Sequence, residues 1–264
     1  MGNCLVTKLK GNVQNNNLQK LGKLELVFNV KVTDINNSKL IQLGTGNKVM
    51  FDKAVKVDSD TVPANTEITY DPYKAILALE AGTIKATIDK YTMTQLHSED
   101  RGGTRPPVEC TKVIGFNFMP ALTIFNLGGC VMDVEGFKES TNLTQVKSLS
   151  RLTGDIGYLK DCINITRFNV TGSSTLKGDV AVLGKMNLTT LEIASTQISG
   201  DIDDFVAARL EKTPSTAGSI RIQYANAIYR VKYNGTILAD LVAAGTIGQN
   251  PTLNWDAQGN ITWS

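Results

Sequence analysis

A four-residue pattern that returns at a nearly constant interval limits the possible folds of this chain more than any other feature. The pattern is a hydrophobic residue, Thr, any residue and a hydrophobic residue, and its copies are residues 122–125, 143–146, 165–168 and 188–191. Successive copies start 21, 22 and 23 residues apart. A fixed period of about 20 to 29 residues is typical of chains that coil into stacked turns. We therefore predict that each copy forms one short parallel strand of such a coil.

A second pattern runs in phase with the first. An acidic residue followed by Val or Ile recurs at intervals of 22, 24 and 22 residues, at Asp133, Asp155, Asp179 and Asp201. Calcium-binding repeats need a much denser supply of Gly and Asp than one Asp per turn. We interpret the four aspartates as caps of a turn that recurs in every repeat, in preference to a ladder of calcium sites.

The hydrophobic positions of the repeats predict where the core lies. The first, fourth and sixth positions of each copy are expected to point inward, where stacking of neighbouring turns would bury them. The recurring Thr is expected to satisfy backbone groups where the chain turns into the strand. The inward set is Leu122, Phe125, Leu127, Leu143, Val146, Ser148, Ile165, Phe168, Val170, Leu188, Leu191 and Ile193.

The repeats resemble the leucine-rich repeats in two segments. The segment Leu-x-Gly-x-Ile of that family is similar to residues 152–156, 176–180 and 198–202. Its opening segment Asn-Leu-x-x-Leu is similar to the residues that follow Asn142, Asn164 and Asn187. The resemblance implies a short leucine-rich-repeat solenoid over about residues 113–225. It also implies an irregular coil, because the ladder Asn of the family is replaced by Cys130, Arg151, Ser173 and Thr196.

The outward positions of the repeat strands form the candidate binding surface. Repeat coils usually bind partners on their concave face, which these positions would line. A merely solvated face is the alternative, because so few repeats curve little and the row has no aromatic residue to dominate binding. The candidate residues are Gln145, Lys147, Arg167, Asn169, Thr190, Glu192 and Arg221.

Residues 1–97 are predicted to form a small β-rich anchoring domain. Hydrophobic and polar residues alternate from Lys23 to Val32, as in a half-buried strand, with Val27 as the one break. Residues rich in β-branched side chains predict further strands at 67–70 and 83–88, and residues 73–81 favour a short helix. Short strands at this spacing favour a sandwich or a partial barrel.

The rest of the chain is predicted to contain a linker, the repeats and a cap. Residues 98–112 are rich in Gly and Pro and predict the linker. Within residues 113–225, the first seven are expected to cover the open edge of the coil. Residues 226–264 are predicted to form a C-terminal β cap from two hairpins, one around Asn234-Gly235 and one that carries Trp255 and Trp263.

Composition and residue counts argue against several kinds of site. The chain has 27 basic and 25 acidic residues, and the net charge of +2 gives no case for nucleic-acid binding. The single histidine, His97, excludes most catalytic triads and multi-histidine metal sites, and we expect it to be a surface residue. The four cysteines are far apart and are expected to be buried free thiols. We predict no cofactor, no metal and no membrane span.

The opening residues supply a second resemblance. Residues 1–11 resemble the start of uncharacterised proteins from Bacteroidetes and their phages, some of which look like virion components. The amino terminus lacks a basic segment followed by an apolar one, so we expect no secretory signal. The protein would then work inside the cell that makes it, or leave by a route that needs no signal, such as virion assembly and lysis. We therefore expect a non-enzymatic structural or interaction protein, as a phage head-fibre, tail-fibre or decoration subunit that forms homo-oligomers in the virion. Its partners would be other virion proteins or a host-surface protein or glycan. The alternative is a bacterial leucine-rich-repeat protein, in the cytoplasm or at the cell surface, that binds a protein or glycan.

Overall fold

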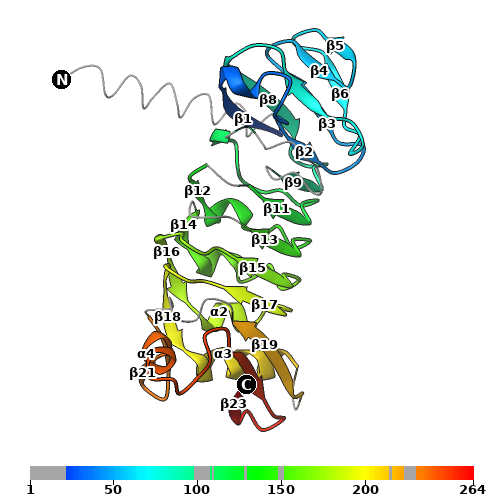
Figure 1. Cartoon of the computed structure of the whole chain (residues 1–264). Helices are drawn as coiled ribbons and strands as arrows, with labels where there is room; N and C mark the ends of the chain where they lie inside the picture. The colour runs from blue at the N-terminus through cyan, green and yellow to red at the C-terminus, as the bar shows by residue number, and fades with distance from the viewer. Residues whose placement is uncertain are drawn as a thin grey trace, which may run out of the picture. The chain divides into compact units, whose positions relative to one another are not determined.

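The computed structural model describes residues 22–97, 108, 110–127, 130–147, 152–213, 216–222 and 230–264. The chain forms two compact units. Unit 1 contains Met1–Leu122 and Leu127–Val131, and unit 2 contains Thr123–Asn126 and Met132–Ser264. Strands make up most of the regular structure of both units (Figure 1), so the predicted mainly β fold is confirmed.

The main sheet of unit 1 is antiparallel and has the strand order β10-β1-β8-β3-β6. Its strands are β1 (Lys23–Val30), β3 (Lys48–Phe51), β6 (Glu67–Thr69), β8 (Gly82–Asp89) and β10 (Cys110–Ile114). The alternation predicted for β1 is confirmed, because Leu24, Leu26 and Phe28 are buried. The break at Val27 coincides with a shift in register against β10 between Val27 and Phe28. A local irregularity in the hydrophobic pattern thus marks an irregularity in pairing.

The remaining elements of unit 1 are short. A three-stranded antiparallel sheet has the order β5-β4-β7, and β2 pairs with β9. The elements are η1 (Val32–Asp34), β2 (Gln42–Leu43), β4 (Val55–Val57), β5 (Asp60–Val62), β7 (Ile76–Ala78) and β9 (Gln95–His97). The helix predicted at 73–81 is wrong, because Ile76, Leu77 and Ala78 are all buried in β7 and pair with β4. An apolar run this short is decided by its pairing partner and not by its own period.

Strand β10 corrects the predicted boundary between linker and repeats. Cys110–Ile114 pairs with β1 in unit 1, so neither a linker that reaches residue 112 nor an edge cover that starts at Val113 matches the structure. The strand gains a neighbour that lies about 85 residues earlier in the chain, which local composition does not reveal. The rest of the predicted linker, 98–107 with residue 109, lies outside the described residues.

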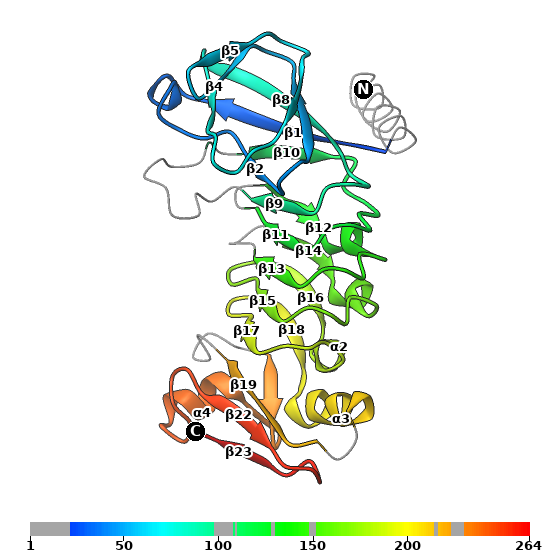
Figure 2. The same cartoon turned by 90° about the vertical axis from the view of Figure 1, so that its right-hand side faces the viewer.

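Unit 2 is built on a parallel sheet to which each repeat contributes one strand (Figure 2). Its strands are β11 (Ile124–Asn126), β13 (Gln145–Lys147), β15 (Arg167–Asn169), β17 (Thr190–Glu192) and β19 (Gly218–Ile222). The central residues Phe125, Val146, Phe168, Leu191 and Ile222 lie side by side in register and are buried. The predicted inward positions are confirmed, except that Ser148 lies outside the described residues.

A second parallel sheet runs through the same repeats, in the order β12-β14-β16-β18-β20. Its strands are β12 (Met132–Asp133), β14 (Leu152–Asp155), β16 (Thr175–Asp179), β18 (Gln197–Asp201) and β20 (Val231–Tyr233). The first four lead into helical turns, namely η2 (Val134–Phe137), η3 (Ile156–Leu159), α2 (Ala181–Gly184) and α3 (Ile202–Lys212). One repeat is therefore a strand, a second strand and a helical turn, which matches the predicted stacking.

The C-terminal residues form the two predicted hairpins. Strand β20 and β21 (Thr236–Ile237) form the hairpin whose turn is Asn234-Gly235, with both φ angles positive at 49° and 76°. Helix α4 (Leu238–Ala243) follows, and then β22 (Thr252–Trp255) and β23 (Ile261–Trp263). Strand β22 pairs antiparallel with β19, so the last hairpin continues the first sheet beyond its final repeat strand.

Trp255 ties this hairpin to the repeats. Its Nε1 donates a hydrogen bond of 3.2 Å to the carbonyl oxygen of Thr216, and its ring meets Phe205 of α3 edge to face. Arg209 lies beside both rings and donates a hydrogen bond of 2.7 Å to the carbonyl oxygen of Leu188. Within the part of the chain that is described, no helix is long and apolar enough to cross a membrane.

Candidate functional site

A ladder of threonines fixes the start of each repeat strand. The Oγ1 hydroxyls of Thr144, Thr166 and Thr189 each donate a hydrogen bond to the carbonyl oxygen of the Thr one turn earlier, at 2.9, 3.1 and 3.1 Å. The backbone N–H groups of the same three residues donate to the same oxygens at 2.8, 2.7 and 2.8 Å. The predicted role of Thr in satisfying backbone groups is confirmed, and the partner is the preceding turn. The ladder therefore sets the register of the outward side chains.

The recurring aspartates cap the helical turns, as predicted. The Oδ1 atom of each aspartate accepts a hydrogen bond from the backbone N–H group two residues later in the chain. The distances are 2.9 Å for Asp133, 2.8 Å for Asp155, 2.9 Å for Asp179 and 3.1 Å for Asp201. These caps engage backbone donors that a helical turn leaves unsatisfied. Among the described residues, no three His, Cys, Asp or Glu side chains gather as a metal site would require.

A glycine directly precedes the capping aspartate in every repeat that packs against a preceding repeat. Gly154, Gly178 and Gly200 have positive φ angles of 90°, 129° and 117°. A Cβ atom at Gly200 would lie 2.5 Å from Oδ1 of Asp179, and one at Gly178 would lie 2.7 Å from Oδ1 of Asp155. The carboxylate of one turn thus occupies the space that a side chain would need in the next. The first repeat has Met132 instead, and β12 is the edge strand of this sheet.

The structure brings the predicted surface residues together on the first parallel sheet. Pairing aligns Gln145 with Arg167, Arg167 with Thr190, and Thr190 with Arg221. It aligns Lys147 with Asn169, and Asn169 with Glu192, in a second row. The seven residues therefore form two rows across four strands, which we call the repeat face.

Burial divides the repeat face unevenly. Arg167 and Arg221 are exposed, whereas Asn169 and Glu192 are only 5% and 4% exposed. The expectation that Asn169 and Glu192 face a partner is therefore wrong. Both lie in the second row, each at the last residue of its repeat strand, whereas the exposed arginines lie in the first row. Nη2 of Arg167 lies 3.5 Å from Oε1 of Glu192, which gives the buried carboxylate an opposite charge.

The accessible part of the repeat face is basic. Gln145, Lys147 and Thr190 are half-buried and join the two exposed arginines. Of the two exposed arginines, Arg167 has the carboxylate of Glu192 beside it. Surface charge of one sign steers association with a partner of the opposite sign more than it adds affinity.

The prediction for the histidine is wrong, and the prediction for the cysteines is confirmed where they are described. His97 is 2% exposed in β9, with Nε2 3.3 Å from Oε1 of Gln95, so the predicted surface position is wrong. Strand pairing with β2 buries it. Cys110, Cys130 and Cys162 are buried free thiols, as predicted, and Cys4 lies outside the described residues. Burial, aided by the charge of Asp161, raises the pKa of Cys162 to about 11.

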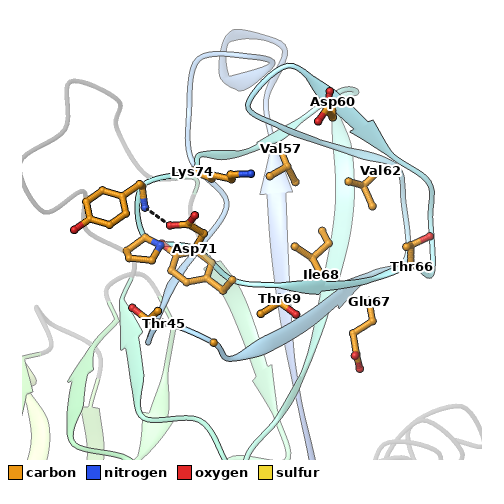
Figure 3. A pocket seen from close by; sticks show the side chains of 14 residues that line it. Thr45, Val57, Asp60, Val62, Thr66, Glu67, Ile68, Thr69, Asp71 and Lys74 are labelled. Atoms are coloured by element: carbon orange, nitrogen blue, oxygen red, sulfur yellow. Dashed lines mark hydrogen bonds between the residues drawn. The ribbon is translucent and has the colours of Figure 1, made fainter.

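Unit 1 contains an open pocket that the sequence did not suggest (Figure 3). Its volume is about 970 Å³, and its walls come from β4, β5, β6 and the segment 69–74. In Figure 3, Asp71 and Lys74 lie on one side and Asp60 and Thr66 on the other, with Val57, Val62 and Ile68 between them. The one signal in the sequence is Asp71-Pro72, a turn-forming pair directly before the residues for which a helix was predicted.

Known proteins supply no family for this chain. A scan of protein-family models finds no match, and a search of curated proteins finds no similar sequence. The leucine-rich-repeat resemblance therefore stays a prediction. The parallel stacking of the turns rests on the strand pairing of this chain alone.

Proposed function

We propose that this protein is a non-enzymatic interaction protein whose repeat face contacts another protein. The observation that carries the proposal is the alignment of the accessible predicted residues on a sheet held in register by the threonine ladder. These residues are Gln145, Lys147, Arg167, Thr190 and Arg221. A rigid, pre-organised face loses little conformational freedom when a partner binds. The partner surface is expected to be acidic, because the two exposed side chains of the face, Arg167 and Arg221, are both cations.

We propose further that the protein belongs to a bacteriophage virion, as a head-fibre, tail-fibre or decoration subunit, and forms homo-oligomers there. The resemblance of residues 1–11 to virion-like proteins supports this placement, and those residues lie outside the described part of the chain. In this arrangement unit 1 attaches the protein to the particle and unit 2 makes the protein contacts. A bacterial leucine-rich-repeat protein is the rival proposal, and it shares the repeat face but not the particle.

Cross-linking within intact particles tests the role of the repeat face. A variant with Lys147→Ala, Arg167→Ala and Arg221→Ala removes three cations of the face. A matched variant with Lys160→Ala, Lys177→Ala and Lys232→Ala removes three exposed cations elsewhere in unit 2. We expect the first variant to lose the cross-links between unit 2 and its partner, and the matched variant to keep them.

Two outcomes would contradict the proposal. Equal loss of cross-links in both variants would mean that total charge matters and that the face does not. Unchanged cross-links in the face variant would place the contact elsewhere. Thermal unfolding of both variants controls for folding. Exposed charges contribute at most about 1 kcal/mol each, but loss of Arg167 also removes the cation beside the buried Glu192 carboxylate.

A further inference from the structure

We propose that the open pocket of unit 1 binds a neutral saccharide, with Tyr73 as an aromatic platform and the polar rim as the site that recognises hydroxyl groups. This site goes beyond the protein contact proposed for the repeat face, and the two are tested separately. The pocket lies wholly within unit 1, and its described walls come from four segments of the chain between Thr45 and Lys74.

The size and lining of the pocket suit a small polar ligand. A volume of about 970 Å³ lies at the upper end of what small-molecule sites occupy. The floor carries Val57, Val62 and Ile68, which are half-buried and leave apolar surface at the base of the pocket. A sugar ring has apolar C–H faces and a polar circumference, so it matches an apolar floor inside a polar rim.

Tyr73 is the most exposed large hydrophobic side chain among the described residues of unit 1, at 96%. Its backbone position is nevertheless fixed, because its N–H donates a hydrogen bond of 2.9 Å to Oδ1 of Asp71 (dashed line in Figure 3). The N–H of Lys74 donates one of 3.0 Å to the carbonyl oxygen of Asp71 and completes the turn. These bonds fix the backbone of Tyr73, and its exposed ring can offer an electron-rich face to the polarised C–H groups of a sugar.

The rim contains both hydrogen-bond donors and acceptors. Asp60 and Asp71 offer carboxylate oxygens, and Lys74 offers an ammonium group. Thr45 and Thr69 offer hydroxyls that can donate and accept. A sugar hydroxyl also donates and accepts, so neighbouring hydroxyls can each find a partner on such a rim.

The charges of the rim favour a neutral ligand over an acidic one. Nζ of Lys48 lies 2.6 Å from Oε1 of Glu67, which neutralises that carboxylate. Asp60 and Asp71 then face the single cation Lys74 among the residues that line the pocket. A sialylated or sulfated glycan would meet this excess of negative charge, whereas a neutral sugar would not.

Saturation-transfer NMR on the full chain tests the proposal with glucose, galactose, mannose, N-acetylglucosamine and N-acetylgalactosamine as probes. Sialic acid serves as the acidic counterpart. We expect at least one neutral sugar to receive saturation from the protein, and Tyr73→Ala to weaken its binding by about tenfold, the value of one aromatic contact. Tyr158→Ala, which removes a partly exposed tyrosine of unit 2, is the matched control and should bind as the unmodified protein does.

The outcomes separate this site from the repeat face. The proposal is overturned if no neutral sugar receives saturation, if only sialic acid does, or if Tyr73→Ala binds as well as Tyr158→Ala. Binding of a peptide in the pocket in place of every sugar would overturn it as well. The repeat-face variant with Lys147→Ala, Arg167→Ala and Arg221→Ala should keep sugar binding. The results of the cross-linking and sugar-binding experiments are therefore independent of each other.

Discussion

Replacing Gly200 with Ala tests the contact between successive turns. The backbone of Gly200 has φ = 117°, a region that L-residues rarely adopt, and a Cβ atom there would lie 2.5 Å from Oδ1 of Asp179. The backbone strain costs about 1–3 kcal/mol. Displacing Asp179 also breaks its hydrogen bond of 2.9 Å to the N–H of Ala181, and the lost cap costs about 1 kcal/mol. We expect a total loss of about 2–4 kcal/mol in the free energy of unfolding.

Tryptophan fluorescence during urea unfolding measures this loss, because both tryptophans of the chain, Trp255 and Trp263, lie in unit 2. Gly245→Ala is the matched control in the same unit. Gly245 also has a positive φ, of 71°, but a Cβ atom there would meet nothing within 4 Å. We expect this control to lose only the strain, so it should be clearly more stable than Gly200→Ala.

A double-mutant cycle isolates the contact itself. Asp179→Ala removes the carboxylate that the new methyl group would strike, so Gly200→Ala should cost less in that background. We expect a coupling of about 1 kcal/mol or more, within the range for residues in direct contact. If Gly200→Ala costs the same with and without Asp179, the carboxylate does not occupy the space above the glycine and the reasoning is refuted.

Three further predictions concern single groups. Thr166→Val should lower the free energy of unfolding in urea by about 1 kcal/mol, because the hydroxyl that donates to the carbonyl oxygen of Thr144 is lost. Thr166→Ser keeps a hydroxyl and should recover most of this loss. Equal stability of the two variants would contradict the ladder. Cys162, a thiol with pKa about 11, should resist a thiol reagent at neutral pH until the chain unfolds, and labelling of the native protein at this residue would contradict its burial. Burial lowers the pKa of Lys90 in the folded protein, so the charge of Lys90 destabilises the fold below that pKa. This cost disappears as the pH rises towards the ordinary pKa of lysine, about 10.4, which applies to the unfolded chain. Urea unfolding should therefore show the unmodified protein gaining stability relative to Lys90→Met as pH rises from neutral, and a constant difference would show that the two states share one pKa.

The repeat period predicted most of unit 2 because it reports contacts between neighbouring turns. Positions about 22 residues apart become adjacent when turns stack, so Thr144 meets Thr123 and Asp179 meets Gly200. The sequence thus contained both sides of each contact, because four copies of the motif form three contacts between successive turns. The repeat period did not predict how deeply each side chain of the repeat face is buried. Asn169 and Glu192 are buried in the second row of the face, and their burial depends on side-chain packing that the repeat period does not report.

Unit 1 was less predictable because its contacts connect distant and unrelated segments. Strand β10 pairs with β1 across about 85 residues, and β7 pairs with β4, so neither could be placed from local pattern. The pocket has the same origin. Its walls come from separate short segments, and none of them is unusual in composition by itself.

The presence of this protein in virus particles tests the proposed function most directly. Particles purified from the lysate of the host that carries the gene would be digested and measured by quantitative mass spectrometry. We expect the protein in a fixed ratio to the major capsid protein through successive purification steps. A protein that stays with the soluble fraction, and is monomeric by light scattering, would contradict the account.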